Sequence, residues 1–476
     1  MTVQTLHRDV AVIGAGTAGL AAERAARNNG ASTVLIDPHF DGTLCANVGC
    51  MPSKLLIAAG REASRARQAG LFGITVGDVR VDGPAVMRRV RKERDRFARL
   101  TRESIEELPE DVTVRARARF DGPNRLLLDD GHTIEAKAII VATGSKAALP
   151  GPFADLGDRV LTNDTVFELK DLPRRLAVVG SGSIGLELAQ AFAHLGVEVT
   201  LFDRSDRMAG MRCPKVHDAL RKIVEGDLTL HLGVDVEPER TEEGVRVRWK
   251  PADDGDGAGG EKEFDLLLAA LGRPPQLDGL DLENAGLELD EDGVPCHDRS
   301  TMRCGDSAVF LAGDVAADRP LLHEASHDGA IAGRNAAALP VEIEVDRHVA
   351  FSVIFTDPPV ASIGEAEADG AITGSSDYSD QGRARVDGRN EGVLTLYAAA
   401  PDGRLIGADL IAPAGDHLAH IVAWAIEQGM TASEVLAMPF YHPTIEEGLK
   451  DALRTICAAT PIALPQDHDT GSPPGT

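Results

Sequence analysis

The chain has 476 residues, of which 43% are hydrophobic and 26% charged, and its formal net charge is −26 at pH 7. At ~150 residues per domain, this length predicts about three domains. Nucleic acid and anionic membranes are poor partners for so acidic a chain, because phosphate groups are bound by basic surfaces. The charge fits an acidic soluble enzyme, and adaptation to high salt is the alternative explanation.

The N-terminal region argues against export. It leads into a strand-like apolar run within about nine residues, without a hydrophobic signal region or a cleavage site. The sequence contains no run of about 18 apolar residues, which is the length a membrane span requires. We therefore expect a cytoplasmic protein without membrane contacts.

Residues 9–37 have the pattern of a dinucleotide-binding strand–helix–strand unit. An apolar run is followed by Gly14, Gly16 and Gly19 in GxGxxG spacing, then by an alanine-rich helix and a second strand that ends at Asp37. The glycines allow the backbone to approach a pyrophosphate, and the start of the helix supplies N–H donors. The acidic residue can accept hydrogen bonds from ribose hydroxyls, so the context supports the motif.

Residues 42–54, GTLCANVGCMPSK, contain two closely spaced cysteines, Cys45 and Cys50. Five residues of ideal helix rise ~7.5 Å, whereas a disulfide requires Cα atoms about 4.4–6.8 Å apart. A bridge between them therefore requires an irregular helix, which Gly49 would permit, with a regular helix starting near Pro52. Such a bridge would be labile and catalytic, and two unpaired buried thiols are the alternative. The other four cysteines are at positions 213, 296, 304 and 457. The cysteines do not have the spacing of metal ligands, so no metal is expected.

A second fingerprint follows at residues 176–203, with Gly180, Gly182 and Gly185 and an acidic Asp203. Both fingerprints place the acidic residue 23 positions after the first glycine. Two such motifs predict two bound dinucleotides and electron transfer between them. An acidic residue at this point favours NAD over NADP because it repels a 2′-phosphate, although two arginines follow it closely, at positions 204 and 207.

The remaining segments indicate how the chain is divided. The pattern of residues 136–150 predicts a strand through which the chain leaves the first nucleotide fold. Residues 251–263 are predicted to form an exposed hairpin tip inside the second fold. Residues 309–335 read as a strand, a Gly-Asp turn and a helix that return to the first fold. From about residue 351 the pattern predicts an α+β domain, and the last dozen residues predict a disordered tail.

Taken together, these motifs resemble those of the class I flavoprotein disulfide reductases, the pyridine nucleotide-disulfide oxidoreductase family. The resemblance extends from residue 8 to about residue 460 and includes CANVGCMPSK (45–54), ATG (142–144), GRPP (272–275), AGD (312–314), FTDPPVASIGEAEA (355–368) and YHPTIEE (441–447). It implies an α/β fold with two Rossmann-like nucleotide-binding domains of the three-layer ββα type and a C-terminal α+β dimerisation domain. The implied ranges are 1–148 with 272–345 for FAD, 149–271 for NAD(P), 346–465 for dimerisation and 466–476 for a flexible tail.

The resemblance also implies roles for the thiols and for one ion pair. Cys50 would lie against the flavin, and Cys45 would exchange with the disulfide substrate. Lys54 would lie near the flavin and pair with Glu187. Electrons would pass from a dithiol to the cysteine pair, then to FAD and to NAD.

Further site residues come from the same resemblance. His442 and Glu447 would be supplied by the partner subunit of a homodimer as the general acid–base and its orienting carboxylate. Without the family, His442 would be interpreted as a solvated or capping histidine. Cofactor contacts are implied for Gly14, Gly16, Gly19, Asp37, Lys54, Ala118, Thr143, Gly144, Gly180, Gly182, Gly185, Glu187, Asp203, Gly272, Arg273, Gly313, Asp314, Pro320, Leu321, Leu322 and His323.

Within the family, the chain most resembles the dihydrolipoyl dehydrogenases, which oxidise protein-bound dihydrolipoamide and reduce NAD. Lipoyl domains or the core of a 2-oxoacid dehydrogenase complex would then be partners. One alternative is an NAD(P)H-dependent reductase of glutathione or another small disulfide. The other is a mainly structural flavoprotein subunit of a multienzyme complex, whose acidic surface would meet a basic binding domain.

Four features of the sequence bear on this choice. Ser183 stands where a bulky side chain often shields the flavin, which suggests higher oxygen reactivity. LLH at 321–323 and Asp203 differ from the residues that glutathione reductases tend to have at these positions, and both differences favour a dihydrolipoyl dehydrogenase. Cys457 stands alone, which argues against mercuric reductases and large thioredoxin reductases.

Overall fold

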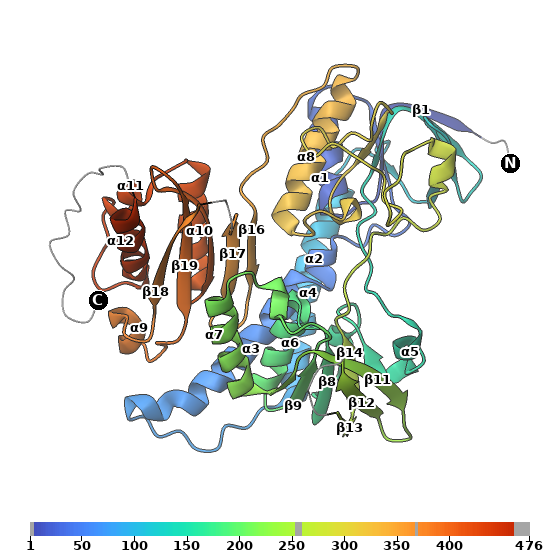
Figure 1. Ribbon diagram of the computed structural model, residues 1–476. Helices are drawn as coiled ribbons and strands as arrows, with labels where there is room; N and C mark the ends of the chain where they lie inside the picture. Colours follow the sequence, from blue (N-terminus) through green and yellow to red (C-terminus); the bar gives the residue numbers. More distant parts are fainter. Residues whose placement is uncertain (1–3, 253–258, 367–369, 461–476) are drawn as a thin grey trace. The chain divides into compact units, whose positions relative to one another are not determined.

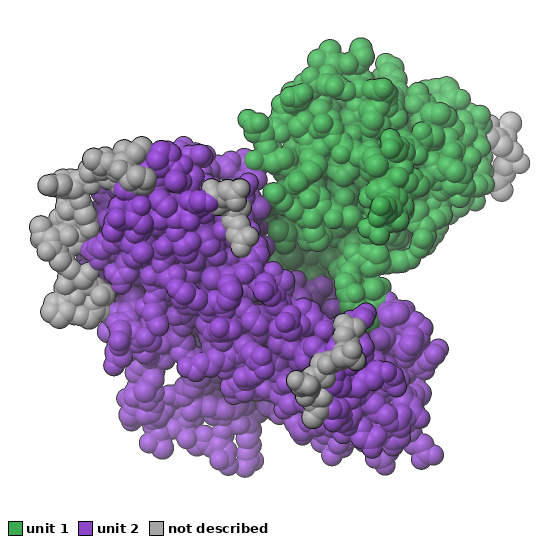
Figure 2. Space-filling model, in the orientation of Figure 1, with its two compact units in different colours: residues 1–52, 88–148, 271–347 green, residues 53–87, 149–270, 348–476 purple. Residues whose placement is uncertain are grey.

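The structure is a computed structural model that describes residues 4–252, 259–366 and 370–460. The chain forms two compact units, shown in green and purple in Figure 2. Unit 1 comprises residues 1–52, 88–148 and 271–347, and unit 2 comprises residues 53–87, 149–270 and 348–476. Two helices, α3 (Cys50–Gln68) and α4 (Gly83–Glu106), begin in one unit and end in the other.

The sheet of unit 1 is built around β1 (Thr5–Ile13), which pairs in parallel with β2 (Thr33–Ile36) and β6 (Thr133–Val141). Val12 lies opposite Leu35 and Ile140 in this register. The last four residues of β1 are buried, as expected for a parallel strand that is covered on both faces. The remaining strands are β3 (Thr113–Val114), parallel to β2; β15 (Val309–Leu311), parallel to β6; and the antiparallel β4 (Ala118–Gly122) and β5 (Arg125–Leu128).

Helix α8 (Leu322–Ala338) lies alongside α1 (Thr17–Asn28) in unit 1 (Figure 1). Two glycines one turn apart make this contact close. A Cβ atom on Gly329 or Gly333 would lie 2.2 Å from the carbonyl oxygen of an alanine on α1. Because real Cβ atoms do not approach a carbonyl oxygen so closely, only glycine allows the two backbones to meet here.

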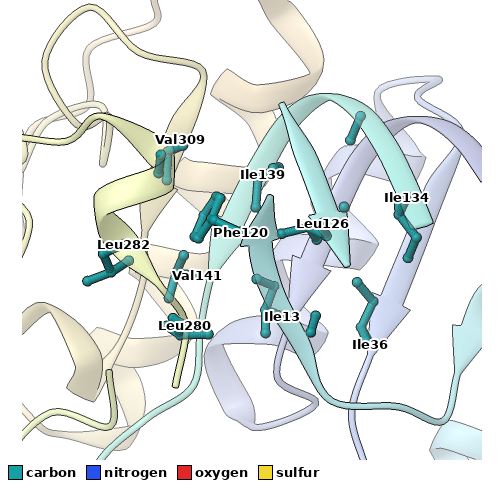
Figure 3. Close-up of a cluster of buried hydrophobic side chains, with 14 of the residues drawn as sticks. Ile13, Ile36, Phe120, Leu126, Ile134, Ile139, Val141, Leu280, Leu282 and Val309 are labelled. Carbon is teal, nitrogen blue, oxygen red and sulfur yellow. The ribbon is translucent and has the colours of Figure 1, made fainter. Parts of the chain in front are cut away.

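A hydrophobic core forms in unit 1 from side chains of the sheet and of residues 280–294 (Figure 3). Phe120 on β4 is fully buried and packs in one cluster with Ile13 and Val141. Each large apolar side chain buried in this way stabilises the fold by about 1.5–3 kcal/mol. The other labelled members are Ile36, Leu126, Ile134, Ile139, Leu280, Leu282 and Val309.

The first part of unit 2 repeats the nucleotide fold of unit 1. Its five parallel strands have the order β10-β9-β8-β14-β7; α6 (Ser183–His194) connects β8 to β9, and α7 (Pro214–Asp227) connects β9 to β10. The strands are β7 (Val160–Leu161), β8 (Arg175–Val179), β9 (Glu198–Phe202), β10 (Thr229–His231) and β14 (Leu266–Ala269). The antiparallel strands β11 (Val234–Arg240), β12 (Val245–Pro251) and β13 (Gly260–Phe264) form a separate sheet. The predicted hairpin is confirmed by its strands, and residues 253–258 at its tip lie outside the described residues.

The second part of unit 2 is an antiparallel sheet with helices, as the predicted α+β domain requires (Figure 1). Its strand order is β16-β17-β20-β19-β18, from β16 (Phe351–Ile354), β17 (Val360–Gly364), β18 (Ile372–Asp377), β19 (Val393–Ala399) and β20 (Arg404–Ile411). Helix α10 (Gly415–Glu427) packs on β17 and β20, and α12 (Leu449–Ala459) on β18 and β19. Shorter helices are α5 (Gly151–Ala154), α9 (Gly382–Val386) and α11 (Ala432–Leu436).

The predicted α/β fold with two Rossmann-like sheets and a C-terminal α+β sheet is confirmed. The predicted tail, residues 466–476, lies outside the described part of the chain. Among the helices that are described, none is both long and apolar enough to cross a membrane.

Candidate functional site

The loop between β1 and α1 has the geometry of a pyrophosphate cradle. Gly14 has a φ of +104°, and a Cβ there would lie 2.4 Å from the carbonyl oxygen of Ala142. A Cβ on Gly19 would lie 1.8 Å from the carbonyl oxygen of Gly14. A Cβ on Gly16 would instead meet nothing within 4 Å, so this side of the loop is open to a ligand. The first N–H groups of α1 have no acceptors within the helix, which suits an anion.

Asp37, the residue after β2, directs its carboxylate at the same loop. Oδ2 accepts a hydrogen bond of 3.0 Å from the N–H of Ala15, and Oδ1 accepts bonds from the N–H groups of His39 and Phe40 at 2.9 and 2.8 Å. The carboxylate is therefore fixed beside the glycines. Its remaining lone pairs can accept from ribose hydroxyls.

A polar cluster in unit 1 brings together residues from three separate predicted motifs. Ser145 donates from Oγ to Oδ2 of Asp314 at 2.8 Å. Arg273 donates from Nε to Oγ of Ser145 at 3.2 Å and from Nη2 to its carbonyl oxygen at 2.8 Å. Thr143 donates from Oγ1 to the carbonyl oxygen of Gln276 at 2.7 Å. Ser145 directly follows the ATG motif but was not among the residues predicted from sequence.

The backbone before Asp314 is held by a buried charged network. The N–H of Gly313 donates to Oδ2 of Asp328 at 3.2 Å, and Arg347 pairs with both Asp328 and Glu324, the latter at 2.7 Å. Burial raises the pKa of the Asp328 carboxyl, and the guanidinium of Arg347 opposes that shift. This network fixes the turn that presents Asp314.

The other cofactor residues predicted in unit 1 lie in its loops and at the ends of its strands and helices. Ala118 opens β4, where it pairs with Leu128. Leu321 is the N-cap residue of α8. Gly144 and Gly272 have positive φ angles of +73° and +100°. Pro320 precedes the N-cap residue, and Leu322 and His323 are the first two residues of α8.

The thiol segment is irregular in the way the disulfide geometry predicts. Helix α2 (Leu44–Asn47) is followed by its C-cap residue Val48, which has the non-helical angles φ −136° and ψ 7°, and α3 begins at Cys50. Cys45 therefore lies on the short helix and Cys50 at the start of the long one. A Cβ on Gly49 would lie 3.1 Å from the Cα of Cys45, so the chain folds back tightly at this glycine. The predicted break between the two cysteines is confirmed.

The loop between β8 and α6 in unit 2 repeats the geometry of the first cradle. Gly180 has a φ of +105°, a Cβ on Gly185 would lie 1.8 Å from the Gly180 carbonyl oxygen, and Gly182 faces open space. Asp203 accepts a bond of 2.6 Å from Oγ of Ser181 and one of 2.7 Å from the N–H of Ser205. Unit 2 therefore contains a second site suited to a dinucleotide.

Lys54 on α3 and Glu187 on α6 form an ion pair in unit 2. Nζ of Lys54 lies 2.7 Å from Oε2 of Glu187, whose side chain is 7% exposed. The other carboxylate oxygen accepts a bond of 2.9 Å from the N–H of Phe355. Phe355 begins the FTDPPVASIGEAEA motif, for which no site role was predicted from sequence.

His442 and Glu447 form a pair of their own in the loop before α12. Nδ1 of His442 lies 3.1 Å from Oε2 of Glu447. Glu447 also accepts from the N–H of Thr444 at 3.2 Å and completes a capping box with this residue. The carboxylate is 3% exposed and the imidazole 51%. A buried acid thus orients a histidine that solvent or another chain can reach.

The two units divide the predicted residues between them. Unit 1 holds the first fingerprint, the polar cluster around Asp314 and both cysteines, and unit 2 holds the second fingerprint, the Lys54–Glu187 pair and the His442–Glu447 pair. Across residues 4–252, 259–366 and 370–460, no group of three or more His, Cys, Asp or Glu side chains is arranged to hold a metal ion.

Comparison with known proteins gives a consistent result. Residues 8–330 match the family described as pyridine nucleotide-disulphide oxidoreductase, and residues 350–453 match its dimerisation domain. The chain is 32% identical over 464 residues to dihydrolipoyl dehydrogenase of Haloferax volcanii, covering 93% of this chain and 95% of that protein. It is 32% identical over 464 residues to dihydrolipoyl dehydrogenase 3 of Pseudomonas aeruginosa, covering 93% and 97%.

A solved structure with a similar fold is that of the HOCl-induced flavoprotein disulfide reductase RclA from Escherichia coli. It superposes with a TM-score of 0.79 at 22% identity and covers 94% of this chain and 99% of RclA. At this identity, the likeness concerns the fold alone.

Proposed function

This chain belongs to the pyridine nucleotide-disulphide oxidoreductase family, and from that premise we propose that it is an NAD-dependent dihydrolipoyl dehydrogenase. At the level of the family it is a flavoprotein disulfide oxidoreductase that uses FAD and NAD(P). The finer assignment is supported by relatives of that name that match nearly the whole chain. The observation that carries it is the broken helix that places Cys45 and Cys50 on either side of Gly49.

We assign the two cradles to the two dinucleotides. Residues 1–148 and 272–345 would bind FAD and residues 149–271 would bind NAD, because each range contains a glycine loop whose middle glycine faces open space. Asp203 supports NAD rather than NADP, since its carboxylate would repel a 2′-phosphate. When bound, FAD accepts an electron pair from the thiols and the nicotinamide carries it away as a hydride.

Residues that would hold FAD are Gly14, Gly16, Gly19, Asp37, Ala118, Thr143, Gly144, Gly272, Arg273, Gly313, Asp314, Pro320, Leu321, Leu322 and His323, with Lys54 beside the flavin. Residues that would hold NAD are Gly180, Gly182, Gly185, Glu187 and Asp203. The open loops and the fixed carboxylates of these sets fit the phosphate and ribose groups of the cofactors.

The thiol chemistry is a disulfide exchange in two steps. One thiolate of dihydrolipoamide attacks Sγ of Cys45 in the Cys45–Cys50 disulfide, forming a mixed disulfide and releasing Cys50 as a thiolate. The second substrate thiol then attacks the substrate sulfur of this mixed disulfide, which frees oxidised lipoamide and leaves Cys45 reduced. The substrate loses two electrons and two protons, and the cysteine pair gains the electrons.

His442 is the base for this exchange. Its Nδ1 is held by Glu447 and half of its side chain is exposed, so the other ring nitrogen would take a proton from a substrate thiol. We propose that residues 346–465 form the dimerisation domain and that each His442–Glu447 pair serves the thiols of the partner subunit. Mixed dimers of Cys45→Ser and His442→Ala subunits should then recover about half of the activity of the wild-type dimer, because one of their two sites is intact.

The test of the substrate is a comparison of steady-state rates. Dihydrolipoamide with NAD is compared with glutathione disulfide in the presence of NADPH and of NADH. We expect rapid turnover with dihydrolipoamide and NAD. Negligible lipoamide activity beside rapid reduction of glutathione disulfide would overturn the proposal. The purified protein should also show flavin bands in its visible spectrum, and folded protein without these bands would contradict FAD binding.

The partner of the enzyme follows from the substrate. If the lipoamide is protein-bound, a lipoyl domain of a 2-oxoacid dehydrogenase complex is the physiological partner. We expect kcat/KM for a reduced lipoyl domain to exceed that for free dihydrolipoamide. Equal values for the two substrates would argue against a complex-bound role.

A further inference from the structure

The connection between β16 and β17, residues 355–359, is held by side chains of two helices outside its own sheet. On α6, Gln190 accepts a bond of 2.7 Å from the N–H of Asp357 and donates one of 3.1 Å to its carbonyl oxygen. On α3, Nη2 of Arg61 donates to the carbonyl oxygen of Thr356 at 2.8 Å. Thr356 is fully buried and Gln190 nearly so. Breaking these bonds would leave buried polar groups without partners, so the connection is fixed to α3 and α6.

Phe355, the first residue of this connection, touches both members of the Lys54–Glu187 pair. Its N–H donates to Oε1 of Glu187 at 2.9 Å, while Oε2 of the same carboxylate accepts from Nζ of Lys54 at 2.7 Å. The centre of its ring lies 4.5 Å from Nζ of Lys54. The ammonium is thus held between a carboxylate and the face of an aromatic ring.

These contacts restrict a side chain that would otherwise be mobile. The lysine stem has four rotatable bonds, and the Lys54 side chain is 33% exposed. An ion pair of a partly exposed lysine is by itself a weak constraint on geometry. The ring adds a second attraction from a different direction, which favours one position of the ammonium.

We infer that Phe355 is a positioning residue, which holds the ammonium of Lys54 at one place and so sets the electrostatic environment of electron transfer. The inference rests on the proposed function, in which Lys54 lies beside the flavin. A fixed positive charge favours a neighbouring group that becomes more negative when it is reduced. Loss of the ring should therefore lower the reduction potential at this site and slow electron transfer from NADH.

The test compares Phe355→Leu, Phe355→Tyr and wild type in the purified holoenzyme. Leucine keeps the N–H bond to Glu187 but removes the ring, whereas tyrosine keeps both. We expect Phe355→Leu to shift the flavin midpoint potential to a more negative value and to slow flavin reduction by NADH about tenfold. Phe355→Tyr should remain within about twofold of wild type. Phe351→Leu, four residues upstream on β16, is the matched control and should change neither quantity.

A double-mutant cycle separates positioning from a general disturbance of the fold. If Phe355 acts through Lys54, Phe355→Leu should cause no further shift of the potential in a Lys54→Met background. A full additional shift in that background would overturn the inference, as would a wild-type potential in Phe355→Leu. If Phe355→Leu does not fold, a Phe355→Tyr enzyme that differs from wild type in potential also overturns it.

The outcome is distinguishable from failure of the proposed function. The potential and the rate of flavin reduction by NADH are measured without any disulfide substrate. They therefore test the inference even if lipoamide is not the substrate. Conversely, an unchanged potential in an enzyme that turns over dihydrolipoamide contradicts only the role of Phe355.

Discussion

Nδ1 of His442 lies 3.1 Å from Oε2 of Glu447, and the carboxylate is almost fully buried while half of the imidazole surface is exposed. This arrangement fixes the ring orientation and leaves the second ring nitrogen available for a proton. Glu447 has a further task, because it caps the short 3₁₀ helix at Thr444. A test of its role in catalysis has to separate the two functions.

Glu447→Gln achieves this separation, because glutamine can also complete a capping box but carries no charge. We expect Glu447→Gln to lower kcat with dihydrolipoamide while the thermal unfolding midpoint stays near that of wild type. His442→Gln should lose about 100-fold or more, the contribution of a general base. Glu446→Gln, at the neighbouring position, is the control and should retain full activity. Full activity of Glu447→Gln would show that the carboxylate only caps the helix.

The two glycine loops predict a matched pair of effects. A Cβ on Gly19 or on Gly185 would lie 1.8 Å from the carbonyl oxygen of the first glycine of its fingerprint. We expect Gly19→Ala to be purified without flavin, because the turn of the first cradle cannot form. Gly185→Ala should retain its flavin bands but lose reduction by NADH. Loss of flavin from both variants would indicate that the two sites do not fold independently.

Substitution of the middle glycines tests ligand contact rather than folding. A Cβ on Gly16 or Gly182 meets no protein atom within 4 Å. Gly16→Ala and Gly182→Ala should therefore fold normally and weaken binding of the respective dinucleotide. Unchanged dissociation constants for both cofactors would contradict the assignment of the open space to pyrophosphate. Fluorescence titration of the apoprotein with FAD and of the holoenzyme with NADH measures these constants.

The parts of the site that could be predicted from the sequence are those formed by local contacts. The glycine loops could be predicted because Gly14 to Gly19 and Gly180 to Gly185 each lie within a single turn of chain. The break near Gly49 could be predicted because a disulfide is shorter than five residues of helix. The second role of Glu447 also has a local signal, the Thr-x-x-Glu spacing of a capping box.

Other parts of the site depend on tertiary packing and had no local signal. Phe355 reaches Glu187 across 168 positions of sequence, and Ser145 reaches Asp314 across 169. Neither residue type indicates such a contact, since phenylalanine is usually a core residue and serine is common in turns. Only the packing of the β16–β17 connection against α3 and α6 brings Phe355 to the ion pair.

Asp203 predicts the preference between the two nicotinamide cofactors. Its carboxylate is held by Ser181 and Ser205 at the end of β9, where a 2′-phosphate would meet its charge. We expect wild type to prefer NADH strongly, and Asp203→Asn to reduce the NADH-to-NADPH ratio of kcat/KM by about tenfold. Asp206→Asn, an exposed acid nearby, is the control. An unchanged ratio in Asp203→Asn would mean that other groups select the cofactor.

The last prediction concerns a histidine in the second nucleotide fold that the catalytic chemistry does not use. His231 stacks on Phe202 with ring centres 5.3 Å apart and lies 4.7 Å from Trp249. Burial, assisted by the charge of Lys262, lowers the pKa of His231 below its ordinary value of 6.5. The folded state therefore favours the neutral imidazole, whereas the unfolded chain takes up a proton at higher pH.

The sign of the pH effect follows from this difference. The contribution of His231 to stability is fully present above pH 6.5 and is lost as the pH falls through 6.5 towards the lowered pKa. We expect the urea midpoint to fall more steeply between pH 7.5 and 5.5 in wild type than in His231→Phe. A Trp424→Phe background leaves Trp249 as the single tryptophan, so its emission reports this fold. The exposed His417→Phe should keep the wild-type slope, and equal slopes in wild type and His231→Phe would contradict the assignment.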